Sequence, residues 1–333
     1  MKDRNSSLDG HAILVTGGTG SFGQAFVRHI LAHHRPSRLV VYSRDELKQF
    51  EMQQKFSAKS LRFFIGDVRD NERLNRALAG IDIVVHAAAL KQVPAAEYNP
   101  IECIKTNVIG AENVINACID QKVKKIIALS TDKAVNPVNL YGATKLCADK
   151  LFVAANSLSG ATGPRFSVVR YGNVIGSRGS VIPFFKERSK TGKLPITDAR
   201  MTRFWIRVEE GAAFVERMLG LMRGGEIFVP KIPSMQITDL ATAVCAQCEH
   251  EIIGIRPGEK VHELLITRDD ARSSLEFNDY YIIQPPVPFW QSESSDVIIY
   301  GGEKGKTVAP DFEYASDTNV KWLDVSALRS IIE

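Results

Sequence analysis

HAILVTGGTGSFGQAFVRHILAHH, residues 11–34, is the stretch that decides the fold. Its first six residues predict a short apolar strand, and its last thirteen predict a helix. Gly17, Gly20 and Gly23 permit a tight turn and let the backbone approach a pyrophosphate at the helix N-terminus. Strand, Gly-rich turn and helix in this order predict a dinucleotide-binding unit, although the spacing is GxxGxxG rather than GxGxxG.

Further strands alternate with helices after this unit, which argues for an α/β fold with a Rossmann-type, doubly wound parallel sheet. We expect strands at residues 38–42, 61–67, 81–89, 124–130, 166–174 and 226–230, and helices at 107–120, 141–158, 208–222 and 237–250. After about Asn173 the pattern changes to Gly, Pro and basic residues. We therefore expect a dinucleotide-binding domain over residues 1–175, with parts of 205–250 returning to it. Residues 176–333 are expected to form mainly a smaller substrate-binding domain and a C-terminal tail.

Composition excludes several classes of protein. The net charge of +4, from 42 basic and 38 acidic residues, is too small to indicate a nucleic-acid partner. Residues 1–10 are polar and lack the apolar core of a signal peptide, and no apolar run approaches the ~20 residues of a membrane span. We expect a soluble cytoplasmic protein with no membrane partner.

The cysteines are five in number and scattered, which favours reduced thiols over a disulfide framework. Cys245 and Cys248 form a CxxC within an expected helix. A zinc site would need a second ligand pair, and none has suitable spacing. We therefore expect these two residues to be buried thiols and predict no metal site.

The end of the second strand bears on the choice of cofactor. Ser43, Arg44 and Lys48 offer a hydroxyl and two cations there, which suit a 2′-phosphate, so NADP is favoured over NAD. Asp45 leaves NAD open. The cofactor-binding residues expected at this edge of the sheet, in addition to these three, are Thr16, Gly17, Thr19, Gly20, Ser21, Phe22, Gly23, Asp67, Val68, Ala87, Ala88, Tyr141 and Lys145. His86 lies within an apolar strand and is expected to be structural.

The segment Ser130–Lys150, STDKAVNPVNLYGATKLCADK, carries the expected chemistry. Tyr141 and Lys145 share one face of the helix, so the lysine charge is expected to lower the phenol pKa from its ordinary value of about 10. The adjacent Asp132 and Lys133 offer a second station for proton transfer, which suggests chemistry in more than one step. An exposed Tyr/Lys pair without function is the alternative interpretation.

Several longer segments give the chain a specific resemblance. TGGTGSFG and YGATK resemble the extended short-chain dehydrogenase/reductases. The segments RYGNVIGSRGSVIPFF, TDARMTRFW, GGEIFVPKIPSM, IGIRPGEKVHE and APDFEYAS resemble the inverting UDP-N-acetylglucosamine 4,6-dehydratases. That family implies UDP-N-acetylglucosamine as substrate, a retained NADP and a homo-oligomer, as a hexamer. The implied product is UDP-2-acetamido-2,6-dideoxy-β-L-arabino-hex-4-ulose, in the first step of pseudaminic acid biosynthesis.

The resemblance also implies residue roles. Tyr141, assisted by Lys145, would take the proton from the C4 hydroxyl, Lys133 would be the C5 base and Asp132 the acid at the C6 hydroxyl. Both last groups need unusual protonation states, which burial favours and their mutual attraction opposes. Expected substrate-binding residues are Lys91, Thr131, Asn173, Val181, Thr197, Arg203, Arg256 and Glu259. Arg256 is favoured for the diphosphate and Arg203 competes with it. Either arginine could instead form a structural ion pair, for example with Glu259.

Three alternatives stay open. A 4-epimerase would leave Asp132 and Lys133 idle, and retaining dehydratases commonly show Asp-Glu where this chain has Asp-Lys. A non-catalytic NADP-sensing protein would not need an intact Tyr141 and Lys145.

Overall fold

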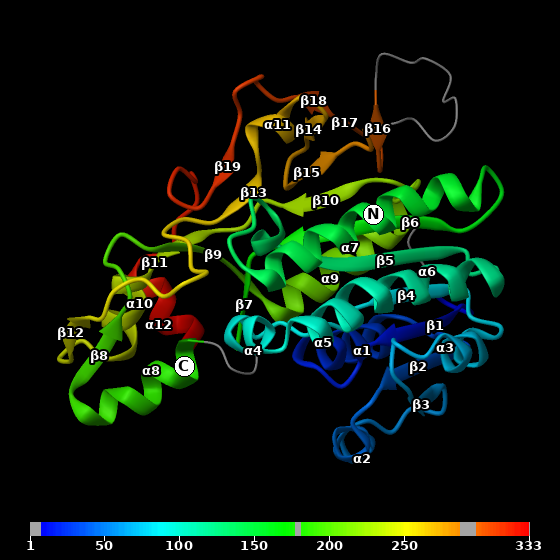
Figure 1. Ribbon diagram of the computed structural model, residues 1–333, viewed down its shortest axis with the longest axis horizontal. Coiled ribbons are helices and arrows are strands. Elements are labelled where there is room, and N and C mark those ends of the chain that lie inside the picture. Colours follow the sequence, from blue (N-terminus) through cyan, green and yellow to red (C-terminus); the bar gives the residue numbers. More distant parts are fainter. Residues whose placement is uncertain (1–7, 177–180, 287–297, 333) are drawn as a thin grey trace.

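The structure is a computed structural model that describes residues 8–176, 181–286 and 298–332. Its centre is a ten-stranded sheet in the order β18-β14-β15-β10-β6-β5-β4-β1-β2-β3 (Figure 1). The seven strands from β10 to β3 are parallel, and β15, β14 and β18 continue the sheet in antiparallel pairing. The doubly wound parallel sheet is thereby confirmed. Its strands are β1 Ala12–Thr16, β2 Arg38–Ser43, β3 Leu61–Ile65, β4 Ile83–His86, β5 Lys125–Thr131, β6 Arg165–Tyr171, β10 Ile227–Pro230, β14 Ser274–Glu276, β15 Tyr280–Ile283 and β18 Lys306–Thr307.

Helices cover both faces of this sheet. The helix α1 (Ser21–His33) packs against α9 (Val208–Leu221), and α9 lies on β5 and β6. A row formed by α3 (Asn71–Leu78), α6 (Gly110–Asp120) and α7 (Leu140–Ser159) packs side by side, with α7 on β5 and β6. The remaining helices beside the sheet are α2 Glu46–Lys55, α4 Val93–Tyr98, α5 Pro100–Ile104, the π-helical η1 Lys105–Ile109, the 3₁₀ turn η2 Asp132–Ala134 and α11 Arg268–Ala271.

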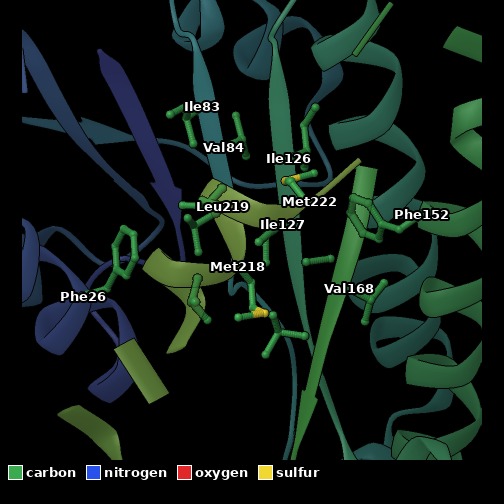
Figure 2. Close-up of a cluster of buried hydrophobic side chains, with 14 of the residues drawn as sticks. Phe26, Ile83, Val84, Ile126, Ile127, Phe152, Val168, Met218, Leu219 and Met222 are labelled. Atoms are coloured by element: carbon green, nitrogen blue, oxygen red, sulfur yellow. The ribbon is translucent and has the colours of Figure 1, made fainter. Parts of the chain in front are cut away.

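The main core lies between the sheet and these helices. Figure 2 shows Phe26 from α1, Met218 and Leu219 from α9, and Met222 directly after α9 beside strand residues such as Ile127. Strands covered on both faces bury every side chain, which explains the uninterrupted apolar runs such as residues 12–15.

A second, smaller core holds the remaining elements. Trp205, Met235, Leu240 and Leu328 pack together there. Its strands and helices are β7 Asn173–Ile175, β8 Lys193–Ile196, β9 Thr202–Arg207, β11 Ser234–Gln236, β12 Glu249–Ile252, α8 Val181–Arg188, η3 Ser189–Thr191, α10 Ile237–Val244 and α12 Val325–Ile332. Two short pairings complete the described part of the structure: β13 Leu264–Ile266 with β19 Tyr314–Ala315, and β16 Ile299–Tyr300 with β17 Glu303–Lys304.

Several expectations need correction or refinement. The helix expected over 237–250 ends at Val244, and residues 249–252 form β12. Beyond this helix end the CxxC turns back, so Cys245 and Cys248 form a disulfide, where reduced thiols were expected. Cys103, Cys118 and Cys147 are free, as expected.

The C-terminal part contributes more to the main sheet than expected. β10 returns to it as predicted, and β14, β15 and β18 add residues 274–283 and 306–307. The two domain boundaries stay a prediction. Residues 1–7 of the segment interpreted as lacking a signal peptide lie outside the described residues. Within the described residues, no helix is both long and apolar enough to cross a membrane.

Candidate active site

A cavity of about 670 Å³ lies at the carboxyl ends of the parallel strands, where open α/β sheets bind ligands. It brings together most of the predicted site residues, which are Gly17, Thr19, Gly20, Ser21, Phe22, Gly23, Ser43, Arg44, Lys48, Asp67, Val68, Ala87, Ala88, Lys91, Thr131, Lys133, Tyr141, Lys145, Asn173 and Val181. Six predicted residues do not line it: Thr16, Asp132, Thr197, Arg203, Arg256 and Glu259.

The Gly-rich turn fits a dinucleotide pyrophosphate. Gly17 has φ +64°, and a Cβ on it would stand 2.8 Å from the backbone nitrogen of Ala88, so only glycine fits. Helix α1 then begins after Gly20 with no side-chain cap and no acidic residue in its first turn. Its N–H groups and positive dipole end therefore face the cavity as an anion site.

Thr16 holds the neighbouring strand ends together instead of lining the cavity. Its hydroxyl lies 3.2 Å from the amide of Ala87 and 2.8 Å from Nδ1 of His86. Burial, together with the charge of Lys145, lowers the pKa of His86 to about 3, so the imidazole is neutral. The expectation that His86 is structural agrees with this environment.

The end of β2 forms the far side of the cavity. The hydroxyls of Ser43 and Thr19 lie 2.8 Å apart. Asp45 caps α2 through the amide of Lys48 and also pairs with the Lys48 amine. The half-exposed Arg44 guanidinium lies 3.5 Å from Asp67. The hydroxyl and the two predicted cations therefore lie together, although a carboxylate accompanies each cation.

The N-terminus of α7 presents Tyr141 and Lys145. Asn139 caps this helix by accepting from the amide of Gly142 at 2.8 Å. The buried Lys145 amine donates to the carbonyl of Leu129 at 2.7 Å. Burial raises the pKa of Tyr141 to about 12, and Lys133 is the cation that opposes this. The expected lowering of the phenol pKa by Lys145 is therefore wrong for this state of the site, because burial outweighs the nearby positive charge.

A buried charge cluster lies beside Tyr141. The Lys133 amine donates to Oδ1 of Asp132 at 2.9 Å and to Asn173 at 3.0 Å, and it lies 3.3 Å from Oε1 of Glu263. Asp132 is fully buried and does not line the cavity. Thr131 connects it to the cavity by donating a hydrogen bond to Oδ1 at 2.9 Å.

Protonation of this cluster differs between its members. Burial raises the pKa of Asp132, as expected for an acid, although Lys133 opposes it. Burial alone would lower the pKa of Lys133, but the carboxylates of Asp132 and Glu263 outweigh it and raise the pKa. The expectation that burial yields a neutral lysine is therefore wrong for this state, because a second carboxylate faces the amine.

Glu263 was missed as a site residue. It is the last residue of the segment IGIRPGEKVHE, and no local pattern places it opposite Lys133. Thr106, Tyr171 and Trp205 also line the cavity without having been predicted. Tyr171 and Trp205 lie in two of the segments that carry the resemblance, and Thr106 directly precedes an expected helix.

Neither predicted diphosphate ligand, Arg203 or Arg256, lines the cavity. Arg203 is buried, donates to the carbonyls of Thr202, Lys260 and Val261, and lies 3.8 Å from Glu263. Arg203 thus forms an ion pair with Glu263 rather than with Glu259, and its role in substrate binding stays a prediction.

The other predicted substrate ligands outside the cavity have local partners. Arg256 is exposed, and its amide lies 3.4 Å from the carboxylate of Glu259 within one turn. Thr197 donates to the sulfur of Met201 at 3.5 Å. A substrate-binding role for these three residues stays a prediction.

Comparison with known proteins defines the family. A family model described as "Polysaccharide biosynthesis protein" matches residues 13–285. The chain is 57% identical over 327 residues to a UDP-N-acetylglucosamine 4,6-dehydratase (inverting) of Campylobacter jejuni, with 98% of each chain covered. The chain belongs to this polysaccharide-biosynthesis family. The predicted resemblance to the inverting dehydratases is confirmed.

Other members and solved structures place the family in a wider group. A UDP-glucose 4-epimerase of Rickettsia canadensis is 42% identical over 279 residues, covering 81% of this chain and 82% of the relative. Pen from Bacillus thuringiensis superposes with a TM-score of 0.88 at 36% identity, with 98% of both chains covered. DesIV, a dTDP-glucose 4,6-dehydratase from Streptomyces venezuelae solved with NAD, shares the fold with a TM-score of 0.67 at 23% identity, over 75% of this chain and 86% of that chain.

Proposed function

We propose that this family member is a UDP-N-acetylglucosamine 4,6-dehydratase that inverts C5. The observation that carries the proposal is the joint position of Tyr141 and Lys133 at one cavity, with Asp132 bonded behind Lys133. The high identity to the Campylobacter jejuni dehydratase supplies the substrate. A sugar hydroxyl and a C–H beside the future ketone each need their own proton-transfer group, and this site holds two.

Tyr141 removes the proton of the C4 hydroxyl in the first step. When bound, a nicotinamide cofactor would accept the hydride from C4 and later return it to C6. The 4-ketone formed on the substrate makes the C5 proton acidic, and Lys133 removes that proton. Because the overall reaction is redox-neutral, the cofactor need not exchange.

Asp132 supplies the proton with which the C6 hydroxyl leaves as water. Its Oδ1 accepts from Thr131 and Lys133, which both line the cavity, so the proton reaches the substrate through one of these two neighbours. A positioned acid or base of this kind contributes about 10²–10⁴-fold in rate. Asn173, bonded to the Lys133 amine, orients that amine toward the sugar.

NADP is the proposed cofactor. Ser43, Arg44 and Lys48 gather at the end of β2, where the 2′ position of the adenosine ribose is expected. A homo-oligomer and the pseudaminic acid pathway, both implied by the resemblance, stay predictions.

One incubation tests the proposal. UDP-N-acetylglucosamine and the purified protein are incubated in D₂O, and the product is followed by NMR. We expect a 4-keto-6-deoxy sugar with inverted C5 that carries deuterium at C5. A product with unchanged C5 configuration would contradict the inversion.

A 4-epimerase is the second candidate, favoured by the relative from Rickettsia canadensis. It predicts a C4 epimer that retains its C6 hydroxyl, and it leaves Asp132 and Lys133 without a role. The same NMR experiment separates the two activities.

A further inference from the structure

Glu263 is a buried carboxylate that the reaction described above does not use. It directly precedes β13, is 2% exposed, and places Oε1 3.3 Å from the Lys133 amine. Its backbone is firmly held, since its amide donates to the hydroxyl of Ser316 at 2.9 Å and its carbonyl accepts from the Ser316 amide at 2.8 Å. The carboxylate is thus held beside the amine by a segment remote from it in the sequence.

The two carboxylates beside Lys133 have different surroundings. Glu263 has two further cations nearby, with Lys260 Nζ 3.6 Å from Oε2 and Arg203 Nε 3.8 Å from Oε1. Asp132 has Lys133 as its one ion-pair partner among the described residues. One oxygen of each carboxyl group, Oδ2 of Asp132 and Oε2 of Glu263, has no hydrogen-bond partner there. Three cations favour a charge on Glu263, whereas full burial beside a single cation favours a proton on Asp132.

Protonation tendencies agree with this geometry. Burial would raise the pKa of both carboxyl groups. Lys133, Arg203 and Lys260 reverse that effect at Glu263 and lower its pKa, whereas burial prevails at Asp132. The charge of Glu263 itself helps to raise the pKa of Asp132, because like charges disfavour joint ionisation.

We propose that Glu263 is a positioning residue of this enzyme: the counter-ion that holds the Lys133 amine toward the cavity and leaves Asp132 as the carboxyl that carries a proton. This inference rests on the proposed function and adds a residue to it. It explains how one cluster supplies both a base and an acid.

The proton count balances with Glu263 ionised throughout. Before the elimination, the Lys133 ammonium passes one proton to Asp132 across their hydrogen bond, so Lys133 enters the step neutral and Asp132 enters it protonated. Lys133 gains the proton from C5 and Asp132 loses one to the departing water, so an ammonium and a carboxylate result. Glu263 stabilises the new ammonium and thereby strengthens the base.

The predicted consequence is a change in the pKa of Lys133 when Glu263 loses its charge. The charged or titratable groups near the amine are Asp132 on its own turn, Glu263 before β13, Arg203 on β9, Lys260, Tyr141 on α7 and Lys91 after β4. Glu263→Gln removes one negative charge, and an opposite charge at this distance typically shifts a pKa by about 1–3 units. The pKa of Lys133 should therefore fall.

Competitive labelling measures this without substrate. The full-length protein is treated with trace acetic anhydride, which acylates neutral amines, at several pH values, and peptides are quantified by mass spectrometry with the exposed Lys55 as internal reference. In the wild type, Lys133 should reach half-maximal labelling at a higher pH than Lys55. In Glu263→Gln, labelling of Lys133 at a fixed pH below that midpoint should rise about 10-fold or more.

Two variants control for structure. Glu263→Asp keeps the charge and should stay within about 3-fold of wild-type labelling. Glu226→Gln removes another buried carboxylate, which is bonded to Ser167 and Tyr300 and does not line the cavity, and Lys133 should label as in the wild type. Equal labelling of Lys133 in wild type and Glu263→Gln would overturn the proposal. If Glu263→Gln does not fold, the wild type still tests the proposal. Half-maximal labelling of Lys133 at or below the pH at which Lys55 reaches it would overturn the proposal.

Turnover supplies the second readout. In Glu263→Gln the acid limb of the kcat–pH profile should move to lower pH by about one unit or more, with a reduced plateau and KM changed less than about 3-fold. In Glu263→Asp the acid limb of the kcat–pH profile should lie near its wild-type position. An acid limb that lies at the same pH in Glu263→Gln and in the wild type would contradict the proposal. The two proposals can also fail separately. If Glu263→Gln changes the labelling of Lys133 but the wild type does not turn over UDP-N-acetylglucosamine, the counter-ion role of Glu263 is supported and the proposed function is contradicted.

Discussion

Gly142 packs directly on the backbone of Lys133: a Cβ built on Gly142 would stand 2.1 Å from the Lys133 carbonyl oxygen. The first turn of α7 therefore sits against η2, and this contact sets how far Tyr141 stands from the Asp132–Lys133 pair. The glycine of YGATK thus has a packing reason that the segment alone does not reveal.

Gly142→Ala should separate these two elements. The added methyl group has no room, so α7 or η2 must shift, and we expect a loss of about 1–3 kcal/mol in the free energy of unfolding. Because displaced catalytic groups can lose about 10²-fold in rate, kcat should fall by a comparable factor. The matched control is Gly211→Ala in α9, where the new Cβ meets only Ile206 at 3.9 Å. That variant should gain about 0.5–1 kcal/mol from helix propensity. Urea unfolding and steady-state kinetics measure both, and equal behaviour of the two variants would refute the packing argument.

Tyr141→Phe should nearly abolish turnover while leaving the fold and UDP-sugar binding intact. The phenol is needed for the first oxidation, so no transient NADPH absorbance should appear in stopped-flow mixing. Tyr314→Phe removes another buried hydroxyl, bonded to the backbone of Ile232 and outside the cavity, and should reduce stability but not kcat. Near wild-type formation of the 4-keto product by Tyr141→Phe would show that the first step is assigned wrongly.

Lys133→Ala should stall the reaction after the first step. It retains Tyr141 and can oxidise C4, but elimination should slow by about 10²–10⁴-fold because the C5 base is absent. Enzyme-bound NADPH should accumulate, and exchange of solvent deuterium into C5 should slow as well, which absorbance and NMR measure. Normal C5 exchange in this variant would assign the base to another residue, with Asp132 or Lys91 next in order.

Arg44→Asp should weaken binding of NADP more than binding of NAD. The half-exposed guanidinium is proposed to face the 2′-phosphate, and the new carboxylate would repel it. Fluorescence titration with both cofactors provides the comparison, and Lys55→Asp, at the C-terminal end of α2, serves as the charge-matched control. Equal losses for NADP and NAD in Arg44→Asp would refute the 2′-phosphate role.

His86 predicts a pH dependence of stability. Its pKa is about 3 in the folded protein, against an ordinary histidine value of 6.5, so between these limits the unfolded chain binds a proton that the folded one does not. The contribution of the neutral His86 imidazole to the free energy of unfolding is thus fully present above pH 6.5 and is lost as the pH falls toward 3. Relative to His86→Gln, the wild type should lose about 2 kcal/mol between pH 7.5 and pH 5. Urea unfolding at the two pH values measures this, and a difference that does not change with pH would contradict a buried neutral imidazole.

The sequence by itself determined the parts of the fold and site that depend on local pattern. The apolar run before Gly17 and the glycine spacing after it predict strand, turn and helix, because backbone geometry and periodicity act over a few residues. Alternation of strands and helices then predicts the parallel sheet and brings Lys133 and Tyr141 to one edge of it. The motifs around them predict the family and the chemistry.

Only the tertiary structure decided what depends on contacts between distant segments. Glu263 reaches Lys133 because β13 lies beside η2, and the strands β14, β15 and β18 join the main sheet because their pairing depends on packing rather than on local propensity. The end of α10 at Val244 likewise brings Cys245 and Cys248 together, against a sequence pattern that favours a longer helix. The protonation of the site follows the same rule, since burial and the charges that oppose it belong to the assembled cluster and to no single segment.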